Sequence, residues 1–307
     1  MTGVLEKILN VLAGDREGRG EITPRFTISR HPCGLWPSDM LIKIGFDIQF
    51  QLPAPTPMML LLFVHPSREP NLRRPQELRI EPATPVTHYH DLFGNHCARV
   101  FLPAGLVSFQ LETVIEDSGR ADRESQAAPQ LPVQDLPNET LAFLLASRYC
   151  EVDKLGDIAW KLFGDTEPGW PRVQAICDWV NRHITFGYEF ADSTKTAWDG
   201  YNDGRGVCRD FNHLAVTFCR CLNIPARYVS GYLGDIGVPA APYPMDFSAW
   251  FEVFLGDRWH PFDARHNCPR IGRVLMAVGR DAADVAITTN FGRAELKKFL
   301  IVTEEVA

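Results

Sequence analysis

The stretch "DGRGVCRDFNHLAVTFCRCLNIPARYVSGYL", Asp203 to Leu233, decides how the C-terminal half of this chain folds. Gly204 and Gly206 permit a tight backbone approach directly before Cys208. Apolar residues then recur at helical spacing, at Leu214, Ala215, Phe218 and Leu222. An Asn-Ile-Pro turn ends this pattern, and a β-branched and aromatic run follows it. The segment therefore predicts a helix that begins at or near Cys208 and returns into a strand.

Cys208 is the candidate nucleophile of this segment. The unpaired N–H groups and the dipole at a helix N-terminus favour a thiolate, which is the reactive form of cysteine. The alternative is a buried and inert cysteine, which is the usual state of a free cysteine in a folded protein. The chain has eight scattered cysteines and no C-x-x-C pair, namely Cys33, Cys97, Cys150, Cys177, Cys208, Cys219, Cys221 and Cys268. They predict reduced thiols rather than a disulfide framework.

A second informative segment is "MDFSAWFEVFLGDRWHPFDARHN", Met245 to Asn267. Two short strand patterns flank Gly256-Asp257, which is a typical two-residue hairpin turn. With that turn, Phe254 faces Trp259 across the hairpin. Side chains alternate between the two faces of a strand, so the position of each polar residue relative to the hairpin can be predicted.

Together, "GRGVCRDFNHL…LNIPARYVSGYL…SAWFEVFLGDRWHPFD" resembles the core of the transglutaminase-like superfamily, whose bacterial members are described as cysteine proteases. The resemblance runs from about Leu136 to Asp263. It implies a papain-like α+β fold in which a cysteine opens a helix packed on an antiparallel sheet. The implied nucleophile is Cys208 and the implied aspartate is Asp263. The family's histidine position, in the "HAW" motif, reads Ser248 in this chain.

A substitute for the missing histidine has to satisfy strand geometry. Ser248 and Asp263 lie diagonally on one side of the hairpin, whereas His260 points to the opposite side. His213 is about 140° around the helix from the cysteine, which favours a structural role. His266 is the best candidate base, because it follows the aspartate by three residues and lies beyond the regular strand. The alternative for His266 is an ordinary surface histidine.

The chain divides into three predicted parts. Residues 1–116 form a β-rich domain, 117–140 a polar, proline-containing linker, and 141–307 the transglutaminase-like domain. Within the first part, alternation from Leu41 to Leu52 predicts a half-buried strand. The third part is predicted to contain helices starting near Asn138 and spanning Lys154–Phe163, Pro171–His183 and Cys208–Leu222. The C-terminal segments "DVAITTNFG" and "LKKFLIVTEEV" are predicted to be sheet-closing strands.

Composition excludes several function classes. The net charge is −7 and no basic block stands out, so we expect no nucleic acid partner. The longest apolar run, Met58 to Val64, is too short to span a bilayer. The N-terminus lacks a secretory signal pattern, with Glu6 and Lys7 in place of an apolar core, and we expect a cytoplasmic protein. The spacing of His88, His90, His96 and Cys97 matches no specific zinc site, so neither a metal nor a cofactor is predicted.

The leading functional prediction is a cysteine-dependent amide or peptide hydrolase that forms a thioester at Cys208. Its partner is a peptide or protein amide substrate. Water accepts the acyl group in hydrolysis and an amine accepts it in acyl transfer, and no segment marks a dedicated amine site. Trp198 is either an indole donor to the oxyanion or a packing residue. The alternative function is a catalytically silent binding module, because Ser248 replaces the expected histidine.

Overall fold

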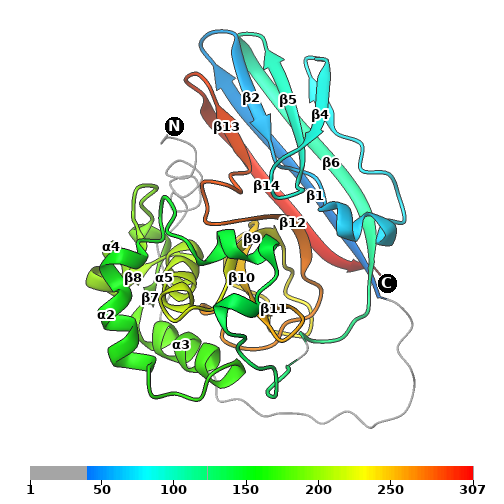
Figure 1. The fold of residues 1–307 in the computed structure, drawn as a ribbon. Helices are drawn as coiled ribbons and strands as arrows, with labels where there is room; N and C mark the ends of the chain where they lie inside the picture. The colour runs from blue at the N-terminus through cyan, green and yellow to red at the C-terminus, as the bar shows by residue number, and fades with distance from the viewer. Residues whose placement is uncertain (1–39, 123, 307) are drawn as a thin grey trace.

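The computed structural model describes residues 40–122 and 124–306. Figure 1 shows a tall β-sandwich above a lower body in which helices cover a third sheet. The sandwich consists of two four-stranded antiparallel sheets, of order β14-β1-β6-β3 and β13-β2-β5-β4. Their strands are β1 (Met40–Leu52), β2 (Thr56–Leu60), β3 (Arg79–Glu81), β4 (Val86–His90), β5 (His96–Leu102), β6 (Gly105–Asp117), β13 (Thr288–Asn290) and β14 (Glu295–Val306).

Strand β1 shows why this part of the chain folds as a sandwich. Its even-numbered side chains from Ile42 to Leu52 are all buried, while Lys43, Asp47 and Gln49 are only partly covered. This period-2 pattern directs one face of the sheet into the core shared with the second sheet. The strand predicted from Leu41 to Leu52 is therefore confirmed.

The two C-terminal strands complete the sandwich, although they lie far away in the sequence. Strand β14 pairs antiparallel with β1, with Ile301 opposite Phe46, and β13 pairs with β2. Both segments are strands, as predicted, but their partners lie within the region predicted as an N-terminal domain of residues 1–116. The prediction assigned all of residues 141–307 to the transglutaminase-like domain. The structure differs, because β13 and β14 are hydrogen-bonded edge strands of the two sandwich sheets.

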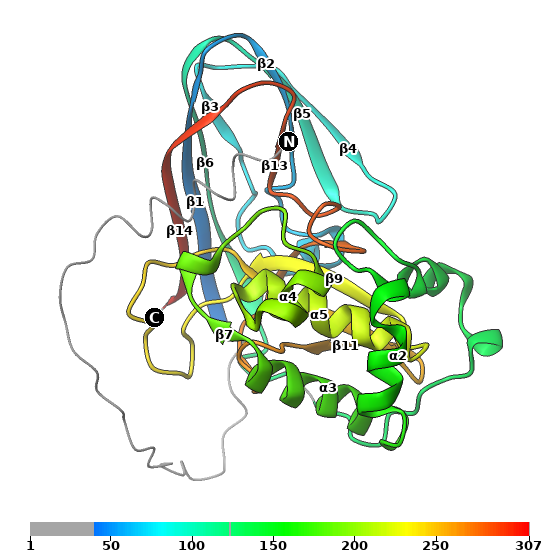
Figure 2. The same ribbon diagram turned by 90° about the vertical axis from the view of Figure 1, so that its left-hand side faces the viewer.

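The lower body is built around the sheet β11-β10-β9-β12. Its strands are β9 (Ala226–Tyr232), β10 (Ser248–Leu255), β11 (Arg258–Phe262) and β12 (Val274–Gly279). Apolar side chains of three helices pack together with β10 and β11, and Figure 2 shows this helical layer from the side. The helices are α2 (Val152–Phe163), α3 (Trp170–His183) and α5 (Cys208–Cys221). This arrangement of a helix layer on an antiparallel sheet confirms the α+β fold class.

The helix predicted to start near Asn138 is present as a 3-10 helix, η3 (Asn138–Leu144). The segment directly before Cys208 contains the short helix α4 (Ala197–Asp203), which the sequence pattern did not predict. Thr196 caps α4 by accepting from Asp199 N–H, and the left-handed residue Gly204 ends it. A seven-residue helix that contains a glycine gives too short a periodic signal to be predicted.

The predicted linker is held against the lower body by specific contacts. Asp122 Oδ2 accepts from Arg270 N (2.9 Å) and from Arg273 Nε (2.8 Å). Gln130 Nε2 donates to Leu222 O (2.8 Å), at the end of α5. The chain between the sandwich and α2 is therefore part of the folded structure rather than a free tether.

Candidate active site

Cys208 is the first residue of α5, as the sequence predicted. The turn before it is capped by Asp210, whose Oδ2 accepts from Val207 N–H (2.8 Å). A Cβ atom at Gly206 would lie 2.5 Å from that same carboxylate oxygen, so only glycine fits there. Asp210 thus caps the helix that presents Cys208, and its carboxylate also receives a hydrogen bond from Arg209 (3.4 Å).

Asn212 fixes this first turn of α5 to the sheet. Its Nδ2 donates to Cys208 O (2.9 Å) and to Ala249 O in β10 (2.9 Å), and the side chain is fully buried. One amide group therefore joins the backbone of Cys208 to the strand that begins at Ser248. The distance between the candidate cysteine and β10 is set by this double hydrogen bond.

Asp263 and His266 form a hydrogen-bonded pair directly after β11. His266 Nδ1 donates to Asp263 Oδ2 (2.8 Å), while the backbone N–H groups of Arg265 and His266 both donate to Asp263 Oδ1 (3.0 Å each). Burial would raise the pKa of Asp263, but the His266 hydrogen bonds and the charge of Arg273 hold it well below its usual range. Asp263 is therefore a carboxylate whose hydrogen bond engages Nδ1 of the imidazole rather than Nε2.

Ser248 and His266 line a common polar pocket with Cys208. This polar pocket has a volume of about 80 Å³ and lies between the start of β10 and the segment that follows Asp263. Four candidate residues from the sequence are thus brought together, three in the pocket wall and Asp263 behind His266. In the described part of the chain, no hydrogen bond joins Cys208 Sγ to His266.

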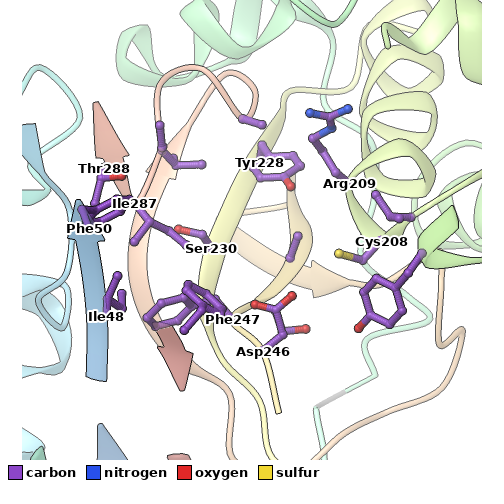
Figure 3. Close-up of a pocket in the computed structure, with 18 residues that line it drawn as sticks. Ile48, Phe50, Cys208, Arg209, Tyr228, Ser230, Asp246, Phe247, Ile287 and Thr288 are labelled. Atoms are coloured by element: carbon purple, nitrogen blue, oxygen red, sulfur yellow. The ribbon is translucent and has the colours of Figure 1, made fainter. Parts of the chain in front are cut away.

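A second, larger pocket opens on the other side of Cys208. Its walls are mostly apolar, its volume is about 130 Å³, and side chains of the sandwich form its far side. Figure 3 shows Cys208 Sγ pointing into this space between Tyr228 and Asp246. The two pockets share Tyr188, Cys208, Asp246, Phe247 and Ser248, so the thiol stands where they meet.

The protonation state of Cys208 differs from the sequence expectation. Desolvation by the surrounding side chains raises the pKa of its thiol to about 11. The positive charge of Arg265 opposes this rise, whereas Asp246, Asp210 and Asp263 add to it. The helix start predicted a thiolate, but burial outweighs it, so Cys208 is a neutral thiol at pH 7 and needs a base for activation.

Asp246 is a site residue that the sequence reasoning missed. It lines both pockets, and burial raises the pKa of its carboxyl to about 7, against the opposing effects of the Phe247 backbone and Arg265. Its position two residues before Ser248 was the available signal, since residues two apart on an extended chain share a face. Arg265, which also lines the polar pocket, is a second residue that the sequence reasoning missed.

His213 and His260, the other two histidines weighed as a substitute base, take structural positions. His213 is fully buried, its ring stacks on Tyr149 (centroids 5.0 Å apart), and its Nε2 accepts from Ala282 N (3.1 Å). Burial holds the pKa of His213 well below its usual value. His260 is buried with its ring edge-on to Trp170 (5.5 Å), away from both pockets, as strand alternation predicted.

Trp198 and Trp250 are both packed against other apolar side chains. Trp198 lies in α4 and packs on the helical core beside Tyr201. Trp250 lies in β10 and is fully buried with Val229 and Val278. Neither tryptophan lines the two pockets at Cys208.

The histidine cluster of the sandwich is held by ring contacts. His88 Nδ1 and His96 Nε2 share a hydrogen bond (3.0 Å), and His96 stacks on Phe63 (4.3 Å). Within residues 40–122 and 124–306, no group of three or more His, Cys, Asp or Glu side chains is arranged to hold a metal ion.

Comparison with known proteins identifies relatives of both parts of the chain. Residues 158–264 match the family model of the transglutaminase-like superfamily. A solved structure from Cytophaga hutchinsonii, described as a "putative cysteine protease", is 30% identical. It superimposes with a TM-score of 0.76, covering 88% of this chain and 92% of that one. This similarity extends over the sandwich as well as the lower body, because the matched share exceeds either part alone.

A curated relative matches a shorter segment. An uncharacterized protein of Mycobacterium leprae is 35% identical over 117 residues. The match spans 37% of this chain and 42% of that protein, so less than half of the relative's length is covered. Among the helices of the described residues, none is both long and apolar enough to cross a membrane.

Proposed function

Because this chain belongs to the transglutaminase-like superfamily, we propose that it is a cysteine-dependent amide or peptide hydrolase with Cys208 as nucleophile. The observation that carries the proposal is the shared pocket of Cys208 and His266, together with the 2.8 Å hydrogen bond from His266 Nδ1 to Asp263 Oδ2. A nucleophile, an imidazole and an orienting carboxylate are the three groups that thiol-based acyl transfer requires. The cysteine protease description of the Cytophaga hutchinsonii relative supports the same class of reaction.

The proposed reaction begins with proton transfer. His266 Nε2 accepts the thiol proton of Cys208 as Sγ attacks the amide carbonyl carbon. The tetrahedral intermediate collapses, the C–N bond breaks, and the imidazolium returns the proton to the departing amine. The acyl group is then a thioester on Cys208. Water attacks this thioester, His266 accepts the water proton, and the carboxylic acid leaves as the thiol is restored. An amine in place of water would give acyl transfer.

Asp263 and Cys208 both support the proposed role of His266 as general base. Asp263 is ionised over the whole neutral range, because the hydrogen bonds of His266 and the charge of Arg273 hold its pKa well below its usual value despite burial. A buried carboxylate on Nδ1 stabilises the imidazolium formed during the reaction. Since the thiol pKa is about 11, the cysteine depends on this base at neutral pH. Cys208 Sγ and His266 share no hydrogen bond among the described residues, and such catalytic contacts often form only in the substrate complex or through one water.

A silent binding module is the second candidate function. Ser248 stands at the family's histidine position and has no acid–base titration near neutral pH. The neutral thiol of Cys208 favours this candidate as well, since an inactive cysteine needs no low pKa. The pockets on either side of the thiol would then bind a peptide without cleaving it.

Pre-steady-state kinetics with activated amides and esters distinguishes the two candidates. The hydrolase should release a burst of leaving group, Cys208→Ala should abolish it, and His266→Ala should slow acylation by about 10²- to 10⁴-fold, the usual contribution of a general base. Ser248→His should add little to a wild type that already uses His266. His90→Ala, at an exposed histidine of β4, is the matched control and should leave the rate unchanged.

Two outcomes would contradict the hydrolase. Turnover that survives Cys208→Ala would exclude the thioester. A wild type and a His266→Ala variant that are equally inert, beside a Ser248→His variant that becomes active, would show that the natural chain lacks its base and binds without cleaving.

A further inference from the structure

The apolar pocket beside Cys208 has two structural sources. Ile48 and Phe50 of β1 and Phe299 of β14 reach it from the sandwich, while Cys208 and Tyr228 reach it from the lower body. Figure 3 shows Ile48 and Phe50 across the pocket from the thiol. The sandwich is therefore a wall of the candidate active site.

The size of the pocket limits what it can hold. Its volume is about 130 Å³. An apolar cavity of about 150 Å³ in another protein accepts benzene, so this space fits one side chain of leucine or phenylalanine size. A Gly residue would leave it empty, and a polypeptide segment would not enter it.

The charged residues that line the apolar pocket lie on the same side of it as the Cys208 thiol. Arg209 and Asp246 are the charged residues among its lining side chains, and Arg209 already bonds to Asp192 O and Asp210. The sandwich side contributes mainly carbon surfaces, such as Ile48 and Phe50, and its lining residues carry no charge. A charged side chain placed there would lose its hydration without gaining a partner.

Two hydroxyl groups in the pocket wall are left without protein partners. Ser230 Oγ and Thr288 Oγ1 are both buried and make no hydrogen bond within the described residues. Both oxygen atoms are shielded from solvent, so they offer no hydrogen bond to an occupant of the pocket, whose walls are mostly apolar. They come from β9 and β13, and therefore from both parts of the chain.

We propose that the apolar pocket binds an uncharged apolar side chain of the substrate, of leucine to phenylalanine size, next to the amide that Cys208 attacks. This inference rests on the proposed function for its placement of the amide. The sandwich thereby determines which residue is accepted at the scissile bond. The polar pocket, which meets the apolar pocket at the thiol, contains His266.

Binding to the unreactive Cys208→Ala variant tests the pocket without depending on turnover. N-acetyl-leucinamide and N-acetyl-phenylalaninamide are titrated by NMR against N-acetylglycinamide and N-acetylglutamate amide. The apolar amides should bind about tenfold or more tightly than the glycine and glutamate amides, because burial of such a side chain has that effect. Equal affinity for all four amides would overturn the inference.

A pair of alanine substitutions provides the matched control. Ala286 lines the pocket, whereas Ala283 is exposed on the same loop and does not line it. Ala286→Phe should fill the space and remove the preference for apolar amides, while Ala283→Phe should keep it. Loss of selectivity in both variants, or in neither, would contradict the proposed pocket. Selective binding without any turnover by the wild type would uphold the pocket and refute the hydrolase.

Discussion

Asp246 and Arg265 act on the thiol of Cys208 in opposite directions. The carboxylate of Asp246 raises the pKa of the thiol, and the guanidinium of Arg265 lowers it. Arg265 is held in place by the ring of Phe186, 3.8 Å from the guanidinium carbon, and by a hydrogen bond to Tyr243 Oη (3.2 Å). Desolvation is the largest cause of the raised thiol pKa, and these two charges adjust it in opposite directions.

Neutralising each charge should shift the alkylation rate of Cys208 with opposite signs. Asp246→Asn removes a negative charge, so the thiol pKa should fall below about 11 and alkylation at pH 8 should become several-fold faster. Arg265→Gln should raise the pKa and slow alkylation by a similar factor. In wild type the rate should keep rising with pH up to about 11. Mass-spectrometric mapping with limiting iodoacetamide over pH 6 to 11 measures all three.

The exposed Cys268 is an internal reference in the same digest. Its rate should be the same in all three proteins, because neither substitution changes its exposure. A shift of the same sign in both variants would show that the substitutions opened the site rather than changed its electrostatics.

At the scale of elements, the first turn of α5 depends on one buried amide. Asn212 binds both the helix and β10, through Cys208 O and Ala249 O. Without the Asn212 amide, the carbonyl oxygens of Cys208 and Ala249 lose this hydrogen-bond donor in the protein interior. Buried hydrogen-bonding groups without partners are costly, so α5 and β10 should lose their fixed spacing.

Asn212→Ala should lower the free energy of unfolding by about 1–3 kcal/mol, the usual cost of an unsatisfied buried group. It should also lower kcat more than it raises KM, since Cys208 would be misplaced. Asn202→Ala is the matched control, because Asn202 also donates to a carbonyl four residues earlier, Trp198 O, but is exposed on α4. Denaturant titration should show a lower free energy of unfolding for Asn212→Ala and almost no change for Asn202→Ala. Similar losses in both would contradict the bridging role.

Elements with a long periodic pattern could be predicted from the sequence. Strand β1, helices α2, α3 and α5, and the β10–β11 hairpin with Phe254 opposite Trp259 all lie where the pattern indicated. The pairing of β14 with β1 could not be predicted, because local alternation specifies a strand and its buried face but not a partner about 250 residues away. The short helices had too few residues to show a period.

The candidate site was predictable in part. The motif indicated Cys208, Asp263 and Ser248, and chain geometry indicated His266, whose hydrogen bond to Asp263 lies beyond the end of β11. The electrostatics were not predictable. Asp246 influences the thiol through space, and the degree of burial of Cys208 depends on residues from both the sandwich and the lower body.

At the scale of the whole molecule, the sandwich joins the two ends of the described chain. In β14, Ile301 faces the sandwich core and is 3% exposed, whereas its neighbour Leu300 faces outward and is 50% exposed. The linker is also fixed, through the bonds of Asp122 to Arg270 and Arg273. A free linker would be the first site of proteolysis. The structure therefore disfavours first cleavage between residues 117 and 140. The chain should unfold as one unit.

Ile301→Ala should lower the free energy of unfolding by about 2–5 kcal/mol, because it leaves a cavity in the core. Leu300→Ala, on the adjacent outward position, should change it by less than about 0.5 kcal/mol. Hydrogen exchange of β1 amides should accelerate in the first variant only, since β1 pairs with β14. Unchanged exchange in β1 after Ile301→Ala would show that residues 40–117 fold independently of the C-terminal strands.

The pairing of β1 with β14 also has a consequence for the chain as it leaves the ribosome. About 240 residues separate the end of β1 from the start of β14. At 5–20 residues per second, synthesis of that interval takes roughly 10–50 s. During this time one edge of β1 has no partner, and the side chain of Phe299 is absent from the pocket beside Cys208. Cys208 precedes Phe299 by 91 residues, so the wall of the apolar pocket is completed only after the thiol has been made.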